Sequence, residues 1–112
     1  MSIPERDLLY LTDMLNYAKR AVQYASETTL DALAEDDKTA LAIERAIEVV
    51  GEAAKSVSPT CREQLPDLPW RDMAQTRDFF AHHYFRIDVG IMWRICQDDL
   101  PKLIQQLEAV LN

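Results

Sequence analysis

The sequence is poor in glycine and cysteine, and both shortages limit the classes of protein to which it can belong. Only 2 of the 112 residues are glycine, while 28% are charged and 48% are hydrophobic, a mixture typical of helical globular proteins and unlike that of disordered chains. The cysteines are Cys61 and Cys96, which are too far apart for a CxxC pair. This disfavours a disulfide scaffold or a zinc cluster. Two free structural thiols in a reducing cytoplasm are the simplest interpretation.

Long apolar runs and positive charge are also lacking. No stretch of about 18 uninterrupted apolar residues occurs, so we expect no membrane span. The first residues, MSIPERDLLY, lack the basic-then-apolar layout of a secretory signal, and we expect a cytoplasmic protein. The formal net charge is −7, which excludes binding of nucleic acid through bulk electrostatics. Any contact with RNA must use a local basic spot or a partner.

Apolar residues recur at spacings of three and four along most of the chain, which predicts helices. No strand-like alternation, repeat or low-complexity linker interrupts this pattern. The expected helical segments are 5–26, 28–34, 37–57, 59–65, one beginning near Pro69, and 88–111 with a break or kink at Pro101. We therefore expect residues 1–112 to form a single domain, an all-α up-and-down bundle of four to five helices.

Two features of this pattern concern packing. Gly51 lies in the middle of segment 37–57, where glycine costs about 1 kcal/mol relative to alanine, so a close contact between helix backbones is expected there. Segments 5–26 and 37–57 each carry two adjoining apolar rows, more than a four-helix core needs. We therefore expect an oligomer, most simply a two-fold homodimer. Trp70 and Trp93 are interpreted as core or interface anchors.

The stretch RDFFAHHYF, Arg77 to Phe85, gathers the only two histidines beside an arginine. Metal-independent RNA cleavage needs a base, an acid and a cation, which imidazole and guanidinium groups supply. Arg77 and His82 are five residues apart, about 140° around an unbroken helix. They can converge if the helix ends near Ala81, and the expected helix cap at Asp88 requires a loop in between. The alternative is a structural histidine and an arginine in an ordinary surface ion pair.

The motif Arg77-x4-His82-x-Tyr84 resembles the signature of the HepT-like toxins of the HEPN superfamily, which are small helical ribonucleases of prokaryotic toxin–antitoxin pairs. Three further stretches resemble the family in the same order: AIEVVGEAAKSV (46–57), DLPWRDM (67–73) and YFRIDVGIMWRICQDDLPKLIQQLE (84–108). The likeness covers about residues 40–110. It implies a HEPN-like fold, a homodimer, and an RNA substrate, either mRNA or tRNA, with no DNA expected.

The resemblance also implies roles for individual residues. Arg77 and His82 match the ribonuclease pair, and Asp78 stands where the family has a polar residue that can orient the arginine. His83 is a possible phosphate ligand, because the superfamily tolerates longer spacings. Glu52 matches the Gly-Glu position and is a candidate polar partner near the site. No metal-ligand spacing occurs, so we expect neither a metal nor another cofactor.

Tyr84 matches the tyrosine to which a paired minimal nucleotidyltransferase antitoxin adds AMP, which silences the toxin. A bulky anionic group beside the cleft would repel RNA. One departure is visible: Ala74-Gln75-Thr76 precedes the arginine where Gly-Met is common, which concerns packing more than chemistry.

Two alternatives to a ribonuclease remain open. One is a non-catalytic HEPN module that binds nucleotide or a partner and accompanies a nucleotidyltransferase, and the acidic charge favours it slightly. The other is a helical dimerisation or scaffolding protein whose motif has lost activity.

Overall fold

The computed structural model describes residues 2–82 and 88–112. Within them all regular structure is helical, which confirms the predicted all-α class. The elements are α1 (Glu5–Ser26), α2 (Leu30–Ala34), α3 (Asp37–Ser56), α4 (Pro59–Gln64), α5 (Trp70–Ala81), α6 (Val89–Arg94), the π-helical turn η1 (Ile95–Asp99) and α7 (Leu100–Leu111). None of the described helices is both long and apolar enough to cross a membrane.

Helix starts follow local signals in the sequence. Four side chains accept a hydrogen bond from a backbone N–H in the first turn of their helix, which satisfies a donor that the helix itself cannot. These caps are Thr29, Asp36, Ser58 and Asp88. The predicted cap at Asp88 is thereby confirmed.

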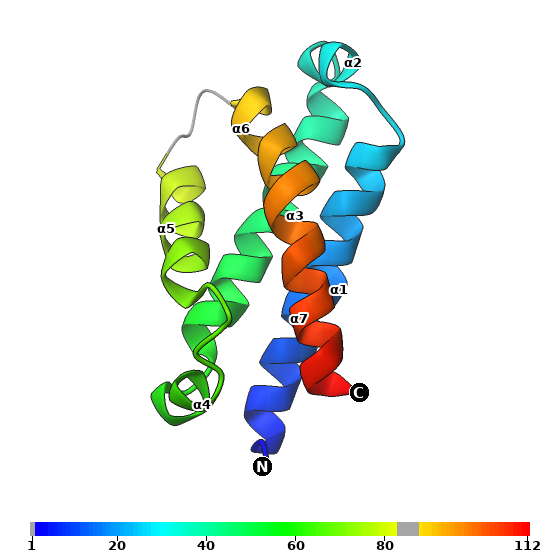
Figure 1. Ribbon diagram of the computed structural model, residues 1–112. Helices are drawn as coiled ribbons and strands as arrows, with labels where there is room; N and C mark the ends of the chain where they lie inside the picture. The colour runs from blue at the N-terminus through cyan, green and yellow to red at the C-terminus, as the bar shows by residue number, and fades with distance from the viewer. Residues whose placement is uncertain (1, 83–87) are drawn as a thin grey trace.

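The C-terminal helix runs through Pro101 without a break. A proline has no N–H to bond the carbonyl four residues earlier, and its ring clashes with that carbonyl. Here the chain widens into a π-helical turn, and the N–H of Leu100 bonds the carbonyl of Ile95, five residues back. The predicted break is therefore a shift of hydrogen-bond register within a helix that continues from α6 through η1 to α7 (Figure 1).

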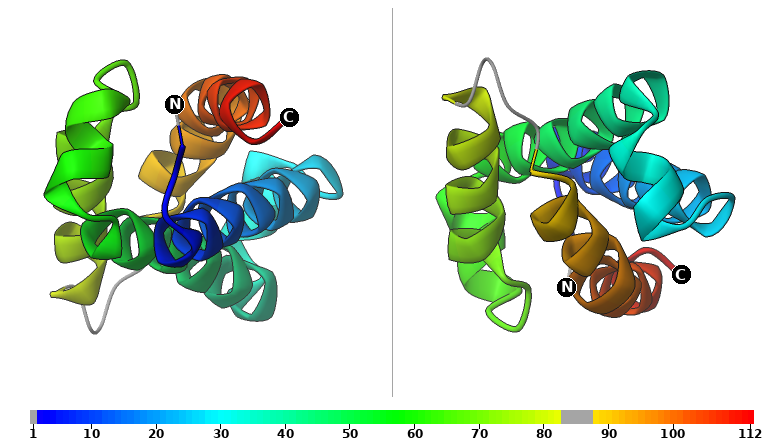
Figure 2. Two further views of the ribbon diagram at one scale, coloured as in Figure 1. Left: turned by 90° about the horizontal axis from the view of Figure 1, so that it is seen from below. Right: turned by 90° about the horizontal axis from the view of Figure 1, so that it is seen from above.

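The helices pack unevenly around α3. α1 packs along α3 and also against α7, whereas the main helix contact of α5 is with α3. The end-on views of Figure 2 place α5 on one side of α3 and α1 on the other. Alanines are buried on both α1 and α3, including Ala18 and Ala46, so these two helices can approach closely. The structure therefore has a tight core around α1, α3 and α7, with α5 attached to its outer edge.

The turn before α5 is held by two polar contacts. Trp70 is half-buried, and its indole N–H donates to the carbonyl of Leu65 at 2.8 Å, which confirms Trp70 as an anchor. Asp7 of α1 is buried and accepts hydrogen bonds from the backbone N–H (2.9 Å) and hydroxyl (2.8 Å) of Ser58. These bonds tie the start of α4 to α1 and thereby fix where the chain turns toward α5.

Candidate active site on the fifth helix

Gly51 sets the distance between α3 and α5. A methyl group added at Gly51 would collide with the β-carbon of Arg77 and would lie 2.8 Å from the carbonyl oxygen of Met73. Only a residue without a side chain therefore allows this approach, which confirms the close contact predicted from the sequence. The two helices run in opposite directions there (Figure 1). The contact presses the backbone of α5 at Arg77 directly onto α3.

The Arg77 side chain is one-third exposed and belongs to a charged triad. Its Nη1 donates to Oδ1 of Asp78 at 3.2 Å, and the same oxygen accepts from Nζ of Lys55 on α3 at 3.0 Å. The hydrogen bond from Lys55, and next the one from Arg77, lower the pKa of Asp78 below its usual value. Asp78 thus stays ionised at neutral pH and bonds the guanidinium, and its role in orienting Arg77 for catalysis remains a prediction from the resemblance.

His82 lies at the exposed end of α5. The helix ends at Ala81, as predicted, and the backbone N–H of His82 donates to the carbonyl of Asp78 at 3.2 Å. No hydrogen bond or ion pair joins the side chains of His82 and Arg77 among the residues that the structure describes. Within the described part of one chain the two groups therefore share a helix end without a hydrogen bond between them.

The remaining predicted site residues are placed differently. His83 and Tyr84 fall within residues 83–87, outside the described part of the chain. Glu52 follows Gly51 on α3, and its carboxylate accepts from Nη1 of Arg45 at 3.1 Å, so its ion pair runs along α3. A contact of Glu52 with the triad is not among its interactions in the described residues.

Lys55 was not predicted as a site residue, although the sequence contains a feature that indicates its contact with α5. Lys55 follows Gly51 by four residues, so it lies on the same face of α3, the face that meets α5. A glycine that marks a close helix contact also marks the neighbouring positions from which side chains can reach the second helix. Lys55 uses that position to bind Asp78.

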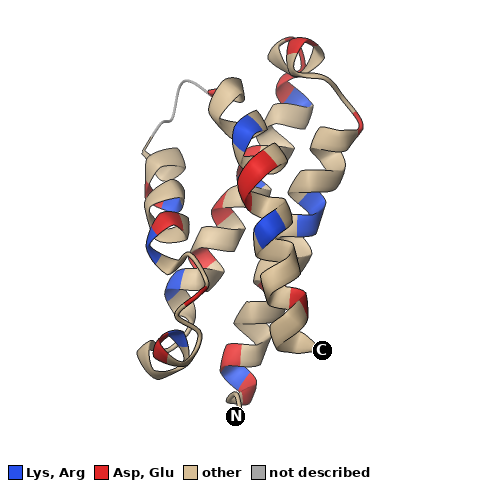
Figure 3. Cartoon of the chain, in the orientation of Figure 1, with Lys and Arg blue, Asp and Glu red and all other residues tan. Residues whose placement is uncertain are grey.

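Charge is mixed around this region. Figure 3 shows basic and acidic residues interspersed along α3 and α5, with no continuous basic stripe in that view. Lys55 and Arg77 converge on one carboxylate, so their triad carries a single net positive charge. In the described residues no group of three or more His, Cys, Asp or Glu side chains is placed to hold a metal ion. One chain therefore offers a small basic spot with an imidazole nearby.

Comparison of the amino-acid sequence with those of known proteins identifies its family. Residues 14–110 match the family described as Ribonuclease HepT-like. A Methanocaldococcus jannaschii protein named "Putative RNase" is 34% identical over 98% of this chain and 92% of its own. A Thermococcus cleftensis protein named "Probable ribonuclease HepT" is 33% identical over 90% of this chain and 92% of its own. No solved structure matches. The chain belongs to the HepT-like ribonuclease family.

Proposed function

We propose that this protein is a metal-independent endoribonuclease in which Arg77 and His82 act on the scissile phosphate. The ribose 2′-oxygen attacks phosphorus and gives its proton to a neutral imidazole. The bond from phosphorus to the 5′-oxygen breaks, and that oxygen takes a proton from an imidazolium. Arg77 stabilises the charge that builds up on the non-bridging oxygens. The products are a 2′,3′-cyclic phosphate and a 5′-hydroxyl.

One observation carries this proposal: Arg77 is held in place before any substrate arrives. Its backbone is pressed onto Gly51, its guanidinium is bonded by Asp78, and His82 stands exposed at the end of the same helix. A cation that is already oriented loses little freedom when it meets a phosphate, which is what stabilisation of a transition state requires. Family membership supports the same activity.

The working unit proposed is a homodimer. One chain offers a single Arg77, which forms no hydrogen bond with His82 in the described residues, whereas two copies beside a two-fold axis would supply two guanidiniums and at least two imidazoles. Several large apolar side chains are exposed, including Leu9 (62%) and Leu41 (56%), as expected if part of the broad apolar surface is covered by another subunit. A pair of sites would also double the local positive charge available to RNA on an acidic protein.

The proposed partner is a minimal nucleotidyltransferase that acts as antitoxin in a type VII-like toxin–antitoxin pair. It would transfer AMP from ATP to the phenolic oxygen of Tyr84, with release of pyrophosphate. Tyr84 follows His82 by two residues, so the added phosphate would place negative charge beside the cleft and exclude RNA. The family resemblance of the motif supports this pairing.

Cleavage of purified tRNA and mRNA in the presence of a chelator tests the proposal. The wild-type protein should cleave the phosphodiester backbone of at least one of the two RNAs without added metal and leave cyclic phosphate ends. His82→Ala should lose cleavage by at least about 100-fold. Arg71→Ala, at an exposed position on the same helix, is the matched control and should retain it. Equal cleavage by wild type and His82→Ala, or none by either, contradicts the proposal.

A second candidate function is a non-catalytic module that binds nucleotide or a partner. The net charge of −7, and the carboxylate that already engages both Lys55 and Arg77, favour it over RNA binding. Calorimetric titration with ATP discriminates: tight nucleotide binding without RNA turnover supports this module and contradicts the ribonuclease.

A further inference from the structure

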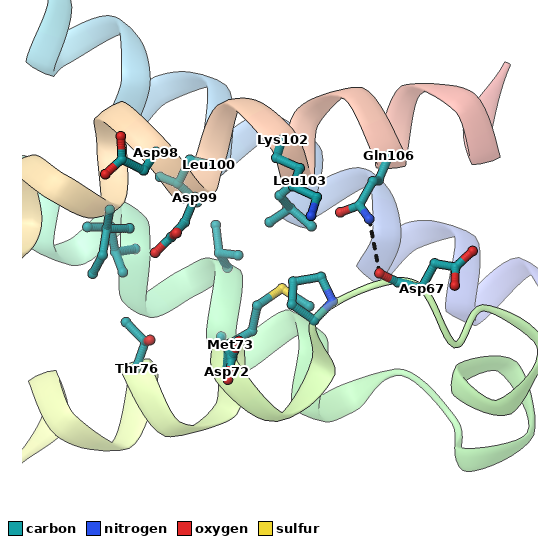
Figure 4. Close-up of a pocket in the computed structure, with 15 residues that line it drawn as sticks. Asp67, Asp72, Met73, Thr76, Asp98, Asp99, Leu100, Lys102, Leu103 and Gln106 are labelled. Atoms are coloured by element: carbon teal, nitrogen blue, oxygen red, sulfur yellow. Dashed lines mark hydrogen bonds between the residues drawn. The ribbon is translucent and has the colours of Figure 1, made fainter.

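A groove separates α5 from the C-terminal helix. It encloses a cavity of about 200 Å³, which α3 floors and α5 and the η1–α7 stretch flank (Figure 4). The apolar residues that line it come from all three sides: Ile47, Val50, Met73, Ile95, Leu100 and Leu103. Figure 4 shows Thr76 and Met73 on one side, with Asp99 and Lys102 on the other. These six side chains are buried, at most 9% exposed, so they form the apolar bottom of a narrow hollow.

The groove continues toward the end of α5. A second hollow is lined by Phe79 and Ile91 and shares Asp72, Thr76 and Asp99 with the first. Phe79 is 37% exposed, which is unusual for so large an apolar side chain. On α5 the residues that line the two hollows run from Asp72 to Phe79, a length of about 12 Å. That is room for about two turns of another helix.

The rim of the groove is acidic. Asp67, Asp72, Asp98 and Asp99 line it, and all four are exposed, while Lys102 is the one basic side chain that lines it among residues 2–82 and 88–112. None of these four carboxylates forms an ion pair with another described residue. The rim therefore presents uncompensated negative charge around an apolar floor.

We propose that this groove binds a basic amphipathic helix of a partner protein. An apolar floor receives side chains spaced by three, four and seven residues along one helix face, and lysines or arginines beside them meet the aspartates. The same charge repels RNA. It also disfavours a second copy of this chain, whose net charge is −7. Charge complementarity thus selects a cationic protein segment.

This binding site is separate from the proposed active site. Asp72 and Phe79 are seven residues apart and share the flank of α5 that lines the groove, whereas Arg77 lies five residues after Asp72, about 140° around the helix. Lys55 and Asp78 lie with Arg77, away from the groove lining. A helix bound in the groove would leave the triad uncovered. The proposed binding site and the proposed ribonuclease activity can therefore be tested independently.

The test uses a fluorescein-labelled peptide of 14 residues that forms one apolar helix face of leucines flanked by lysines. Fluorescence anisotropy should show saturable binding to the wild-type protein. A peptide of the same composition with its amphipathic order scrambled should bind at least about tenfold more weakly, because it cannot seat an apolar face. The double variant Asp72→Asn/Asp99→Asn should weaken binding about fivefold, since each exposed charge contact contributes modestly.

The matched control is Asp13→Asn/Asp31→Asn. It makes the same change in net charge at exposed positions outside the groove, and Asp31, like Asp72, stands in the first turn of its helix. This variant should bind the peptide as the wild type does. Equal weakening by both double variants would show general charge attraction and overturn the proposal, as would absence of saturable binding to the wild type.

A steric variant provides the second line of evidence. Thr76 lines both hollows, so Thr76→Phe should fill the groove and abolish peptide binding, with folding checked by circular dichroism. RNA cleavage should be unchanged in this variant. If Thr76→Phe instead splits a homodimer in light scattering, a second copy is the occupant. If it abolishes RNA binding, RNA is the occupant. Either result overturns the proposal.

Discussion

The two flanks of α5 differ in packing and in charge pairing. On one flank Arg77 is pressed onto Gly51, and Asp78 bonds both Arg77 and Lys55. On the other flank Asp72 and Phe79 face a groove with an apolar floor and unpaired carboxylates on its rim. One helix thus carries a closed surface, whose charged side chains form one ion-pair triad, and an open surface, whose carboxylates are unpaired among the described residues.

The difference follows from what each flank meets. The glycine brings α3 close enough for Lys55 to reach across, and each charge on that flank finds a partner. The C-terminal helix packs instead on α1, so among the elements that the structure describes no helix is seated in the groove beside the opposite flank of α5. A closed flank suits a catalytic cation, whose position must not change, whereas an open flank suits recognition of another molecule.

The largest expected effect tests whether the closed flank is a catalytic one. Arg77→Lys keeps the charge but loses the planar fork that binds two phosphate oxygens at once. We expect RNA cleavage to fall about 100- to 1,000-fold in single-turnover assays. Arg71→Lys on the same helix is the control and should cleave normally. A fully active Arg77→Lys would show that the triad is structural.

The next effect concerns the contact that closes the flank. Gly51→Ala should lower the free energy of unfolding by about 2 kcal/mol, because the methyl group meets the Met73 carbonyl and the Arg77 β-carbon and forces α5 outward. This is the net change, because the cost of the clash outweighs the gain of about 1 kcal/mol in helix propensity. Urea denaturation followed by circular dichroism measures it. A more stable Gly51→Ala protein would contradict the close contact.

Gly90 provides the matched control for this substitution. It is also helical, but an added methyl group would lie 3.4 Å from the Asp88 carboxylate, an ordinary contact. Gly90→Ala should therefore raise the free energy of unfolding by up to about 1 kcal/mol through helix propensity alone. Opposite signs at the two glycines would identify packing, and not helix propensity, as the reason for Gly51.

Features of the closed flank that depend on local sequence could be predicted. The unfavourable placement of glycine within a helix indicated the contact at Gly51, and the Asp88 cap indicated that α5 ends near Ala81. Contacts across helices could not be predicted so directly. The bond from Lys55 to Asp78 joins residues 23 apart, and the bonds from Ser58 to Asp7 join residues 51 apart. Their existence depends on how whole helices are placed.

The open flank was not predicted at all. Periodicity shows which face of a helix is apolar but does not show whether another helix covers it. On α1, for example, Leu11 is fully buried, whereas the apolar Leu8 is 38% exposed. The π-helical turn is a further case, since Pro101 indicated a break or kink but did not indicate the shift of hydrogen-bond register that the helix shows. These features depend on the arrangement of the whole molecule.

The smallest effect tests how the closed flank depends on pH. The pKa of Asp78 is lowered in the folded protein, first by Lys55 and then by Arg77, so its ionised form is the stabilised one. Its contribution is fully present above the usual aspartate pKa of 3.8 and is lost as the pH falls through the lowered value. Asp78→Asn should therefore flatten part of the fall in melting temperature below pH 4. Because the pair is exposed, the change should be small and should shrink in high salt.

Lys55→Met should have the same effect as Asp78→Asn, and the double variant should add little to the effect of either single variant. Additive effects would mean that Lys55 and Asp78 act separately, and the flank would then be held closed by Gly51 alone.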